Sequence, residues 1–207
     1  MSGADSAGAE FDVLVVGGGL VGAAAALAIA GFGVRVGLVD ARQPALNRGS
    51  FGMDVRNIAC SPASQALLAE LGVWSELIAA PYQRMEVWEE RGTSSLAFGA
   101  EEVERAELGW ILENSPTVMA LWARLEAHSG IDVRLGEVTG VSPAADRVTV
   151  SLATESLTAR LLVGADGARS VVRELVGADT EVLATGQKAL ATLVRTQAPH
   201  ELSLIHI

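Results

Sequence analysis

The chain is poor in the residues that build disulfides, metal sites and nucleophilic triads. It contains one cysteine, Cys60, and three histidines among 207 residues. One cysteine cannot form an internal disulfide, and the histidines lack the spacing typical of a metal site or a Ser-His-Asp triad. We therefore expect no metal site and no Ser-His-Asp triad. We also expect Cys60 to be a small buried residue in a reducing, cytoplasmic setting.

Positive charge is also scarce, with 15 Lys and Arg against 25 Asp and Glu and a net charge of −10. No basic stripe is present, which argues against a nucleic-acid partner. Residues 1–10 contain no Lys or Arg, unlike a secretory signal peptide, and we expect them to be a disordered tail. Residues 13–34 carry no charge. Their many glycines, and their division into valine-rich ends around an alanine helix, argue against a membrane span.

What the chain does have is a strand-turn-helix-strand pattern near its start. Phe11–Val16 and Val34–Val39 are short, valine-rich runs typical of strands buried on both faces. Leu20–Ala30 between them is almost all alanine and leucine, which favours a helix. The turn before this helix, Gly17–Gly22, reads GGGLVG and fits the G-x-G-x-x-G pattern of dinucleotide-binding proteins.

Each position of this pattern has a physical role. Gly17 permits a sharp turn, Gly19 lets a pyrophosphate approach the backbone, and Gly22 lets the helix pack against the sheet. Leu20 starts the helix, whose free N–H groups would face the phosphates. Asp40 lies 23 positions after Gly17, close to the roughly 20 expected for the acid that binds ribose hydroxyls. A carboxylate there would repel a 2′-phosphate, so the pattern favours FAD or NAD over NADP.

A long polar loop and a hairpin follow this first unit. Residues 41–57 form the loop, and Arg56 near its end could reach a pyrophosphate as a bidentate donor, although an isolated arginine is more often solvated. Residues 82–98 alternate apolar and polar positions on either side of a turn, which predicts an antiparallel hairpin. This hairpin breaks the βαβ rhythm, so we place it in another layer or domain.

The middle of the chain predicts two capped helices. Ser61-Pro62 should cap one that ends at Gly72, and Ser115-Pro116 should cap one over Thr117–Ser129. Apolar residues at helical spacing on the second helix predict a core-facing side. These residues are Val118, Leu121, Trp122 and Leu125.

Strands dominate the remainder. Ile131–Leu135 predicts one strand, and a short antiparallel meander should follow over Val138–Val141, Arg147–Leu152 and Ser156–Leu161. Leu161–Gly164 then predicts a further, buried strand. Asp166-Gly167 follows it as a tight turn at the end where open α/β sheets bind ligands, and Ser170 can cap the next helix.

Three motifs together resemble a known family: the glycine turn with Asp40, Arg56 in an R-x-x-A setting, and GADGARSVVR at 164–173. In this order they are similar to FAD-dependent aromatic hydroxylases of the para-hydroxybenzoate hydroxylase fold, and most closely to the 2-polyprenylphenol hydroxylases of ubiquinone biosynthesis. The resemblance implies an α/β fold. A Rossmann-like FAD-binding domain, with a parallel sheet, βαβ units and an antiparallel meander, would span 11–180. It would be interrupted at 80–103 by part of a second, antiparallel substrate sheet, and residues 181–207 would begin a truncated substrate domain.

The resemblance also implies the cofactor and its contacts. FAD would be held by the residues that match the family's motifs: Gly17, Gly19, Leu20, Gly22, Asp40, Arg56, Asn114, Asp166 and Gly167. Arg173 would stabilise the Asp166 loop. The flavin, reduced by NAD(P)H, would use O2 to hydroxylate a small phenolic substrate, with no catalytic side chain required. Polyprenyl phenols are lipid-soluble, so the full-length protein would associate peripherally with a membrane or with a biosynthetic complex.

The family's second half is missing from this chain, and Leu202–Ile207 resembles a translated sequencing adapter. We therefore expect an N-terminal fragment that is inactive alone and binds FAD weakly. Two enzyme alternatives stay open: an NAD-dependent dehydrogenase, and another flavin oxidoreductase of the same fold. A third alternative is a truncated, non-functional product. Its sign would be exposed apolar strands at 82–98 and 188–194.

Overall fold

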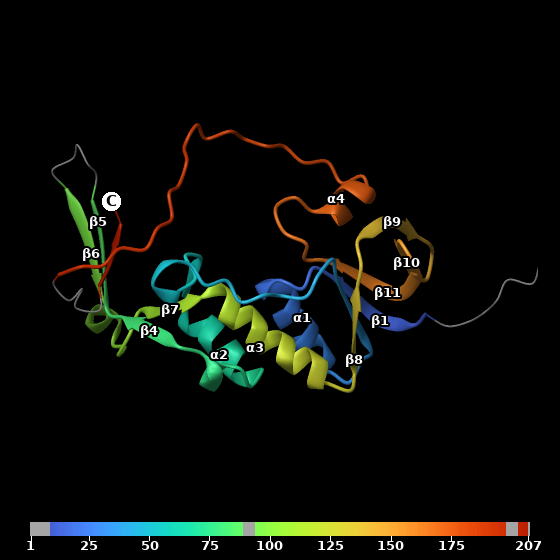
Figure 1. Ribbon diagram of the computed structural model, residues 1–207, viewed down its shortest axis with the longest axis horizontal. Helices are drawn as coiled ribbons and strands as arrows, with labels where there is room; N and C mark the ends of the chain where they lie inside the picture. The colour runs from blue at the N-terminus through green and yellow to red at the C-terminus, as the bar shows by residue number, and fades with distance from the viewer. Residues whose placement is uncertain (1–8, 89–93, 198–202, 207) are drawn as a thin grey trace, which may run out of the picture. The chain divides into compact units, whose positions relative to one another are not determined.

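The computed structural model divides into two compact units (Figure 1). The described residues are 9–88, 94–197 and 203–206. The first unit comprises Met1–Ala45 and Val118–Gln187, and the second comprises Leu46–Thr117 and Lys188–Ile207. Nearly all of the predicted N-terminal tail lies outside the described residues.

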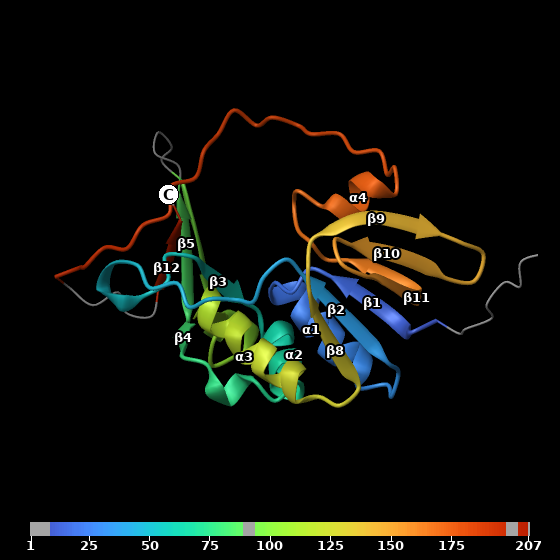
Figure 2. The same ribbon diagram turned by 45° about the vertical axis from the view of Figure 1, so that its right-hand side comes forward.

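The first unit contains a six-stranded mixed sheet in the order β8-β2-β1-β11-β10-β9 (Figure 2). Its strands are β1 (Phe11–Val16), β2 (Val36–Asp40), β8 (Ile131–Leu135), β9 (Val138–Pro143), β10 (Val148–Leu152) and β11 (Ser156–Gly164). The first four strands in the order run parallel, whereas β9, β10 and β11 form an antiparallel meander. This arrangement confirms the predicted α/β class with its meander.

The centre of this sheet is buried because its strands are apolar on both faces. In β1, Leu14 and Val15 are fully buried, and Phe11 is 2% exposed. Helix α1 (Leu20–Ala30) lies against β1, β2 and β8. The alanine side chains of α1 are small and allow this close packing. The helix can therefore begin immediately after the turn that follows β1.

The second half of the predicted meander differs from expectation. Ser156–Leu161 and Leu161–Gly164 are one nine-residue strand, β11, which pairs antiparallel with β10 and parallel with β1. Its C-terminal part is not buried as predicted, because Leu161 faces an open groove of about 780 Å³ and is 55% exposed. The local run of apolar residues could not reveal that this face of the sheet is open.

The second unit contains two three-stranded sheets, in the orders β3-β7-β4 and β12-β5-β6. Its strands are β3 (Asn57–Cys60), β4 (Ala79–Tyr82), β5 (Arg84–Trp88), β6 (Ser95–Gly99), β7 (Gly109–Glu113) and β12 (Ser203–His206). Short 3-10 turns lie at Ser50–Gly52, Trp74–Glu76 and Ala100–Val103. The predicted hairpin is confirmed as β5 and β6, and its turn lies outside the described residues.

Other predictions in this unit have mixed outcomes. Helix α2 (Pro62–Glu70) is capped as expected, because the Ser61 hydroxyl accepts the Ser64 N–H. Cys60 is 4% exposed, and burial raises the pKa of its thiol. The exposed apolar strand at 188–194 that would be a sign of a truncated product is not found: residues 178–197 contain no helix or strand. The side chain of Leu190 in this segment is nevertheless 90% exposed.

Helix α3 (Asn114–Ala127) begins three residues earlier than predicted. The Ser115 N–H donates to the carboxylate of Asp54, so a distant side chain caps the helix and Ser115 lies inside its first turn. The predicted apolar face is confirmed, since Leu121 and Leu125 are fully buried. Helix α4 (Val171–Leu175) is capped as expected, because the Ser170 hydroxyl accepts the Arg173 N–H.

Candidate functional site

The glycine turn joins β1 to α1 at the carboxyl end of the parallel strands. The Gly17 N–H donates to the Val39 carbonyl at 2.8 Å, and the Ala165 N–H donates to the Val16 carbonyl at 2.7 Å. Gly17 has a φ of +106°, and a Cβ there would collide with the backbone of Ala165. Only glycine can therefore hold the turn against the neighbouring strand ends.

On the side that faces the start of helix α1, the turn is closely packed at Gly22 and open at Gly19. A Cβ on Gly22 would overlap the Gly17 carbonyl, so glycine is required for α1 to approach the turn. Gly19, in contrast, is exposed and has no heavy atom within 4 Å of the position of a Cβ. No side chain caps α1. Its first N–H groups are therefore available to an anion such as a pyrophosphate.

Asp40 ends β2 directly beside this turn. Its Oδ2 accepts the Gly18 N–H at 2.6 Å, and its Oδ1 accepts the Arg42 N–H at 3.1 Å. Each carboxylate oxygen can accept more than one hydrogen bond. Asp40 can therefore orient the turn and still accept hydroxyl groups from a ligand.

Asp166 lies in the turn that follows β11. Its carboxylate accepts the Ser170 hydroxyl at 2.5 Å and the Val172 N–H at 3.1 Å. Burial raises the pKa of Asp166, but the hydrogen bonds from Ser170 and Val172 outweigh this effect and lower the pKa overall. Asp166 is therefore charged at neutral pH and fixes the start of α4.

The remainder of this turn is also ordered by the chain itself. Gly167 adopts a φ of +86°, which favours glycine. The Arg173 guanidinium donates from Nη2 to the Ala168 carbonyl at 2.8 Å. This contact confirms the prediction that Arg173 stabilises the Asp166 loop.

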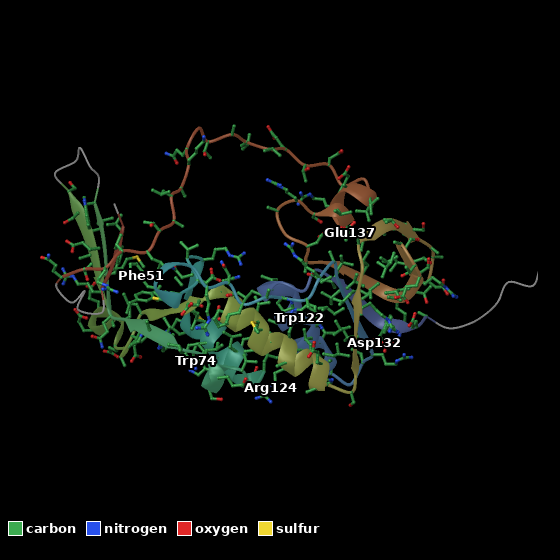
Figure 3. The ribbon with its side chains drawn as sticks, in the orientation of Figure 1. Phe51, Trp74, Trp122, Arg124, Asp132 and Glu137 are labelled. Atoms are coloured by element: carbon green, nitrogen blue, oxygen red, sulfur yellow. The ribbon has the colours of Figure 1, made fainter. Side chains whose placement is uncertain are left out.

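One cavity of about 470 Å³ is lined by Gly17, Asp40 and Asp166 together. The segment between β8 and β9 completes its wall with Gly136 and Glu137, the latter labelled in Figure 3. The Gly136 N–H donates to the Asp40 carbonyl at 2.9 Å. The volume lies within the range of small-ligand pockets. The larger groove near Leu161 contains none of the predicted site residues.

The other two predicted site residues, Arg56 and Asn114, lie in the second unit. The Asn114 N–H donates to the Arg56 carbonyl at 3.0 Å. The Arg56 side chain is 64% exposed, and its Nε lies 3.9 Å from Oδ1 of Asp54. The two residues are thus neighbours, and their contact with a cofactor stays a prediction.

Asp54 is a buried carboxylate that the sequence pattern did not reveal. It is 1% exposed and accepts hydrogen bonds from Asn47 Nδ2 at 3.0 Å, the Arg56 N–H at 2.9 Å and the Ser115 N–H at 3.0 Å. Burial raises the pKa of Asp54, but the hydrogen bonds from Arg56 and Ser115 outweigh burial and lower it. Asp54 therefore ties the Arg56 loop to the start of α3.

We expect Asp54→Ala to lower the free energy of unfolding by about 2–3 kcal/mol at pH 7, because it orphans several buried donors. The native pKa is depressed, so the stabilisation is present above the unfolded pKa, near 4, and is lost as pH falls through the native value. Urea unfolding over a series of pH values should therefore show the full difference from wild type at pH 7, and this difference should shrink progressively as the pH falls below about 4. Asp146→Ala, which removes an exposed ion pair with Arg147, is the matched control and should leave stability unchanged across the series.

These features define a class. A glycine turn after a parallel strand, an uncapped helix start, and an acid at the end of the next strand are the parts of a dinucleotide-binding α/β protein. A model of the family described as FAD binding domain matches residues 10–203. The chain belongs to this family, which confirms the predicted resemblance and favours FAD over the NAD-dependent alternative.

Two curated relatives match most of this chain. The chain is 38% identical over 171 residues to 3-demethoxyubiquinol 3-hydroxylase of Escherichia coli, a match that covers 80% of this chain and 44% of that protein. It is 34% identical over 199 residues to ubiquinone hydroxylase UbiL of Rhodospirillum rubrum, covering 91% of this chain and 44% of that protein. The chain therefore spans less than half the length of these relatives.

Solved structures show the same fold. The p-nitrophenol 4-monooxygenase PnpA from Pseudomonas putida matches with a TM-score of 0.64 at 23% identity, over 81% of this chain and 43% of that one. Aklavinone-11 hydroxylase, solved with FAD and aklavinone, matches with a TM-score of 0.60 at 27% identity, over 83% of this chain and 35% of that one. Among the described residues, no helix combines the length and apolar character needed to cross a bilayer.

Proposed function

We propose that this chain is the part of an FAD-dependent monooxygenase that holds FAD, mainly through the ADP half of the cofactor. The observation that carries this proposal is the single cavity lined by Gly17, Asp40 and Asp166. In the whole protein, the activity would be hydroxylation of a phenolic ring with NAD(P)H and O2. The substrate class is a polyprenylphenol of ubiquinone biosynthesis, in line with the names of the curated relatives.

The residues present fit the cofactor. The open space beside Gly19 and the free N–H groups from Leu20 onward suit the pyrophosphate. Asp40 would accept the ribose hydroxyls, and Asp166-Gly167, Arg56 and Asn114 would contact the remainder of FAD. The flavin supplies the redox and oxygen chemistry when it is bound. The chain binds and orients it, so no side chain is assigned a catalytic role.

The domain limits and location follow from the same proposal. Residues 11–180 would form the FAD-binding domain, with 80–103 inserted as part of the substrate sheet and 181–207 beginning the substrate domain. Because the proposed substrate is lipid-soluble, the whole protein would be cytoplasmic and bound peripherally to a membrane. Association with a biosynthetic complex would serve the same substrate.

A calorimetric titration of the purified chain with FAD tests the proposal. We expect weak binding, with a Kd on the order of tens of micromolar, because the chain supplies contacts to only part of the cofactor. ADP should compete with FAD, since both carry the adenosine and the pyrophosphate, whereas FMN should not. Equal competition by FMN, or no effect of ADP, would place the flavin elsewhere and sink the proposal.

Asp40→Ala should weaken FAD binding by about tenfold, because a charged acceptor of ribose hydroxyls is removed. The variant should at the same time lose discrimination against 2′-phosphorylated ligands, so NADP⁺ should gain affinity relative to ADP-ribose. Competition titrations against FAD measure both effects. Asp146→Ala, an exposed acid of the same unit, should bind as wild type does. An unchanged FAD affinity in Asp40→Ala would show that the ribose does not contact this carboxylate.

A further inference from the structure

Trp122 makes a hydrogen bond that its place on an apolar helix face does not suggest. It lies on α3 and is 3% exposed (Figure 3). Its indole Nε1–H donates to the Gly18 carbonyl at 2.6 Å, across 104 positions of sequence. A buried indole N–H needs a partner, and here the partner is the backbone of the glycine turn.

Gly18 is held on its other side as well. Its N–H donates to Asp40 Oδ2 at 2.6 Å, while its carbonyl accepts from Trp122. A Cβ on Gly18 would lie 2.5 Å from Cζ2 of the Trp122 ring, so the ring packs directly against this residue. Both polar groups of the Gly18 residue are therefore fixed by side chains from β2 and α3.

We propose that Trp122 is a positioning residue for the dinucleotide turn. This inference rests on the proposed function, since the group to be positioned is the backbone that would face the FAD pyrophosphate. Three successive glycines have many backbone conformations, and ordering them costs free energy that binding must otherwise supply. The indole donor removes this freedom before the ligand arrives, so Gly19 and Leu20 already present their N–H groups.

Trp122→Phe tests the inference, because it keeps an aromatic ring and removes the donor. We expect the Kd for FAD to rise about tenfold, the loss of one buried hydrogen bond being about 1.4 kcal/mol. In the ligand-free protein, amide hydrogen exchange at Gly18 should accelerate relative to Leu14 in the core of β1. Leu125→Ala is the control. It removes a buried side chain of the same helix, so it should lower the melting temperature and leave both readouts at wild-type values.

A second variant separates the donor from the packing. Benzothienylalanine at position 122 replaces the indole N–H by sulfur with nearly the same shape, so it remains informative if Trp122→Phe fails to fold. Its FAD affinity and Gly18 exchange should change as in Trp122→Phe. Wild-type affinity and unchanged Gly18 exchange in the sulfur analogue would overturn the inference. If the wild-type chain binds no FAD, the proposed function falls, and the exchange comparison alone still decides whether Trp122 positions the turn.

Discussion

Gly22→Ala should remove a large share of the stability of the first unit. A Cβ at this position would overlap the Gly17 carbonyl, and that carbonyl is fixed because Gly17 lies against Ala165 and bonds to Val39. The Gly17 carbonyl cannot move without breaking the turn that follows β1, and Gly22 cannot move without lifting α1 from the sheet. We expect a loss of about 3–5 kcal/mol, a large share of the 5–15 kcal/mol that typically stabilises a domain.

A loss of stability in Gly22→Ala would be opposite in sign to the effect that helix propensity predicts. Inside an ordinary helix, alanine in place of glycine adds about 1 kcal/mol of stability. A large loss would therefore report the close contact between helix and turn, not helix propensity. Urea unfolding measures the loss, and Val21→Ala, at an adjacent 72% exposed position of the same helix, should be neutral or slightly stabilising. A Gly22→Ala chain as stable as wild type would mean that α1 does not approach the turn so closely.

The glycine turn could be predicted from sequence because its parts are close together along the chain. The spacing of Gly17, Gly22 and Asp40 within one strand-helix-strand segment predicts that they lie close to one turn, and the structure brings Gly17 and Asp40 to one cavity. Asp166 was predictable for a related reason, since it follows an apolar strand directly. Strand β11, which precedes Asp166, pairs with β1, and this pairing places Asp166 beside the glycine turn.

Contacts between distant segments could not be predicted in this way. Asp54 looks like any loop acid, yet it is buried because Ser115, 61 positions later, supplies a free helix N–H. Trp122 was predicted only as a core residue, and its bond to Gly18 has no local signature. The same limit explains why α3 was expected to start too late: the residue that caps it lies on another loop.

Gly19→Ser should have the opposite profile to Gly22→Ala: an intact fold and almost no cofactor binding. Gly19 has φ −68° and ψ −176°, values that any residue adopts, and nothing lies within 4 Å of a Cβ there. Serine is also a favourable N-cap, so its hydroxyl can bond the first free N–H groups of α1. The melting temperature of the ligand-free chain should therefore stay the same or rise slightly.

The same features should exclude FAD. The serine side chain would occupy the space proposed for the pyrophosphate, and its hydroxyl would satisfy donors that the phosphate oxygens need. We expect FAD and ADP affinities to fall together by about 100-fold, which corresponds to about 2.7 kcal/mol. Calorimetric titration measures both ligands, and Phe32→Ser, at an 85% exposed position beyond the far end of α1, should bind as wild type does. If Gly19→Ser retained wild-type affinity for ADP, the pyrophosphate would not lie at this turn, and the stability of Gly22→Ala would then concern the fold alone.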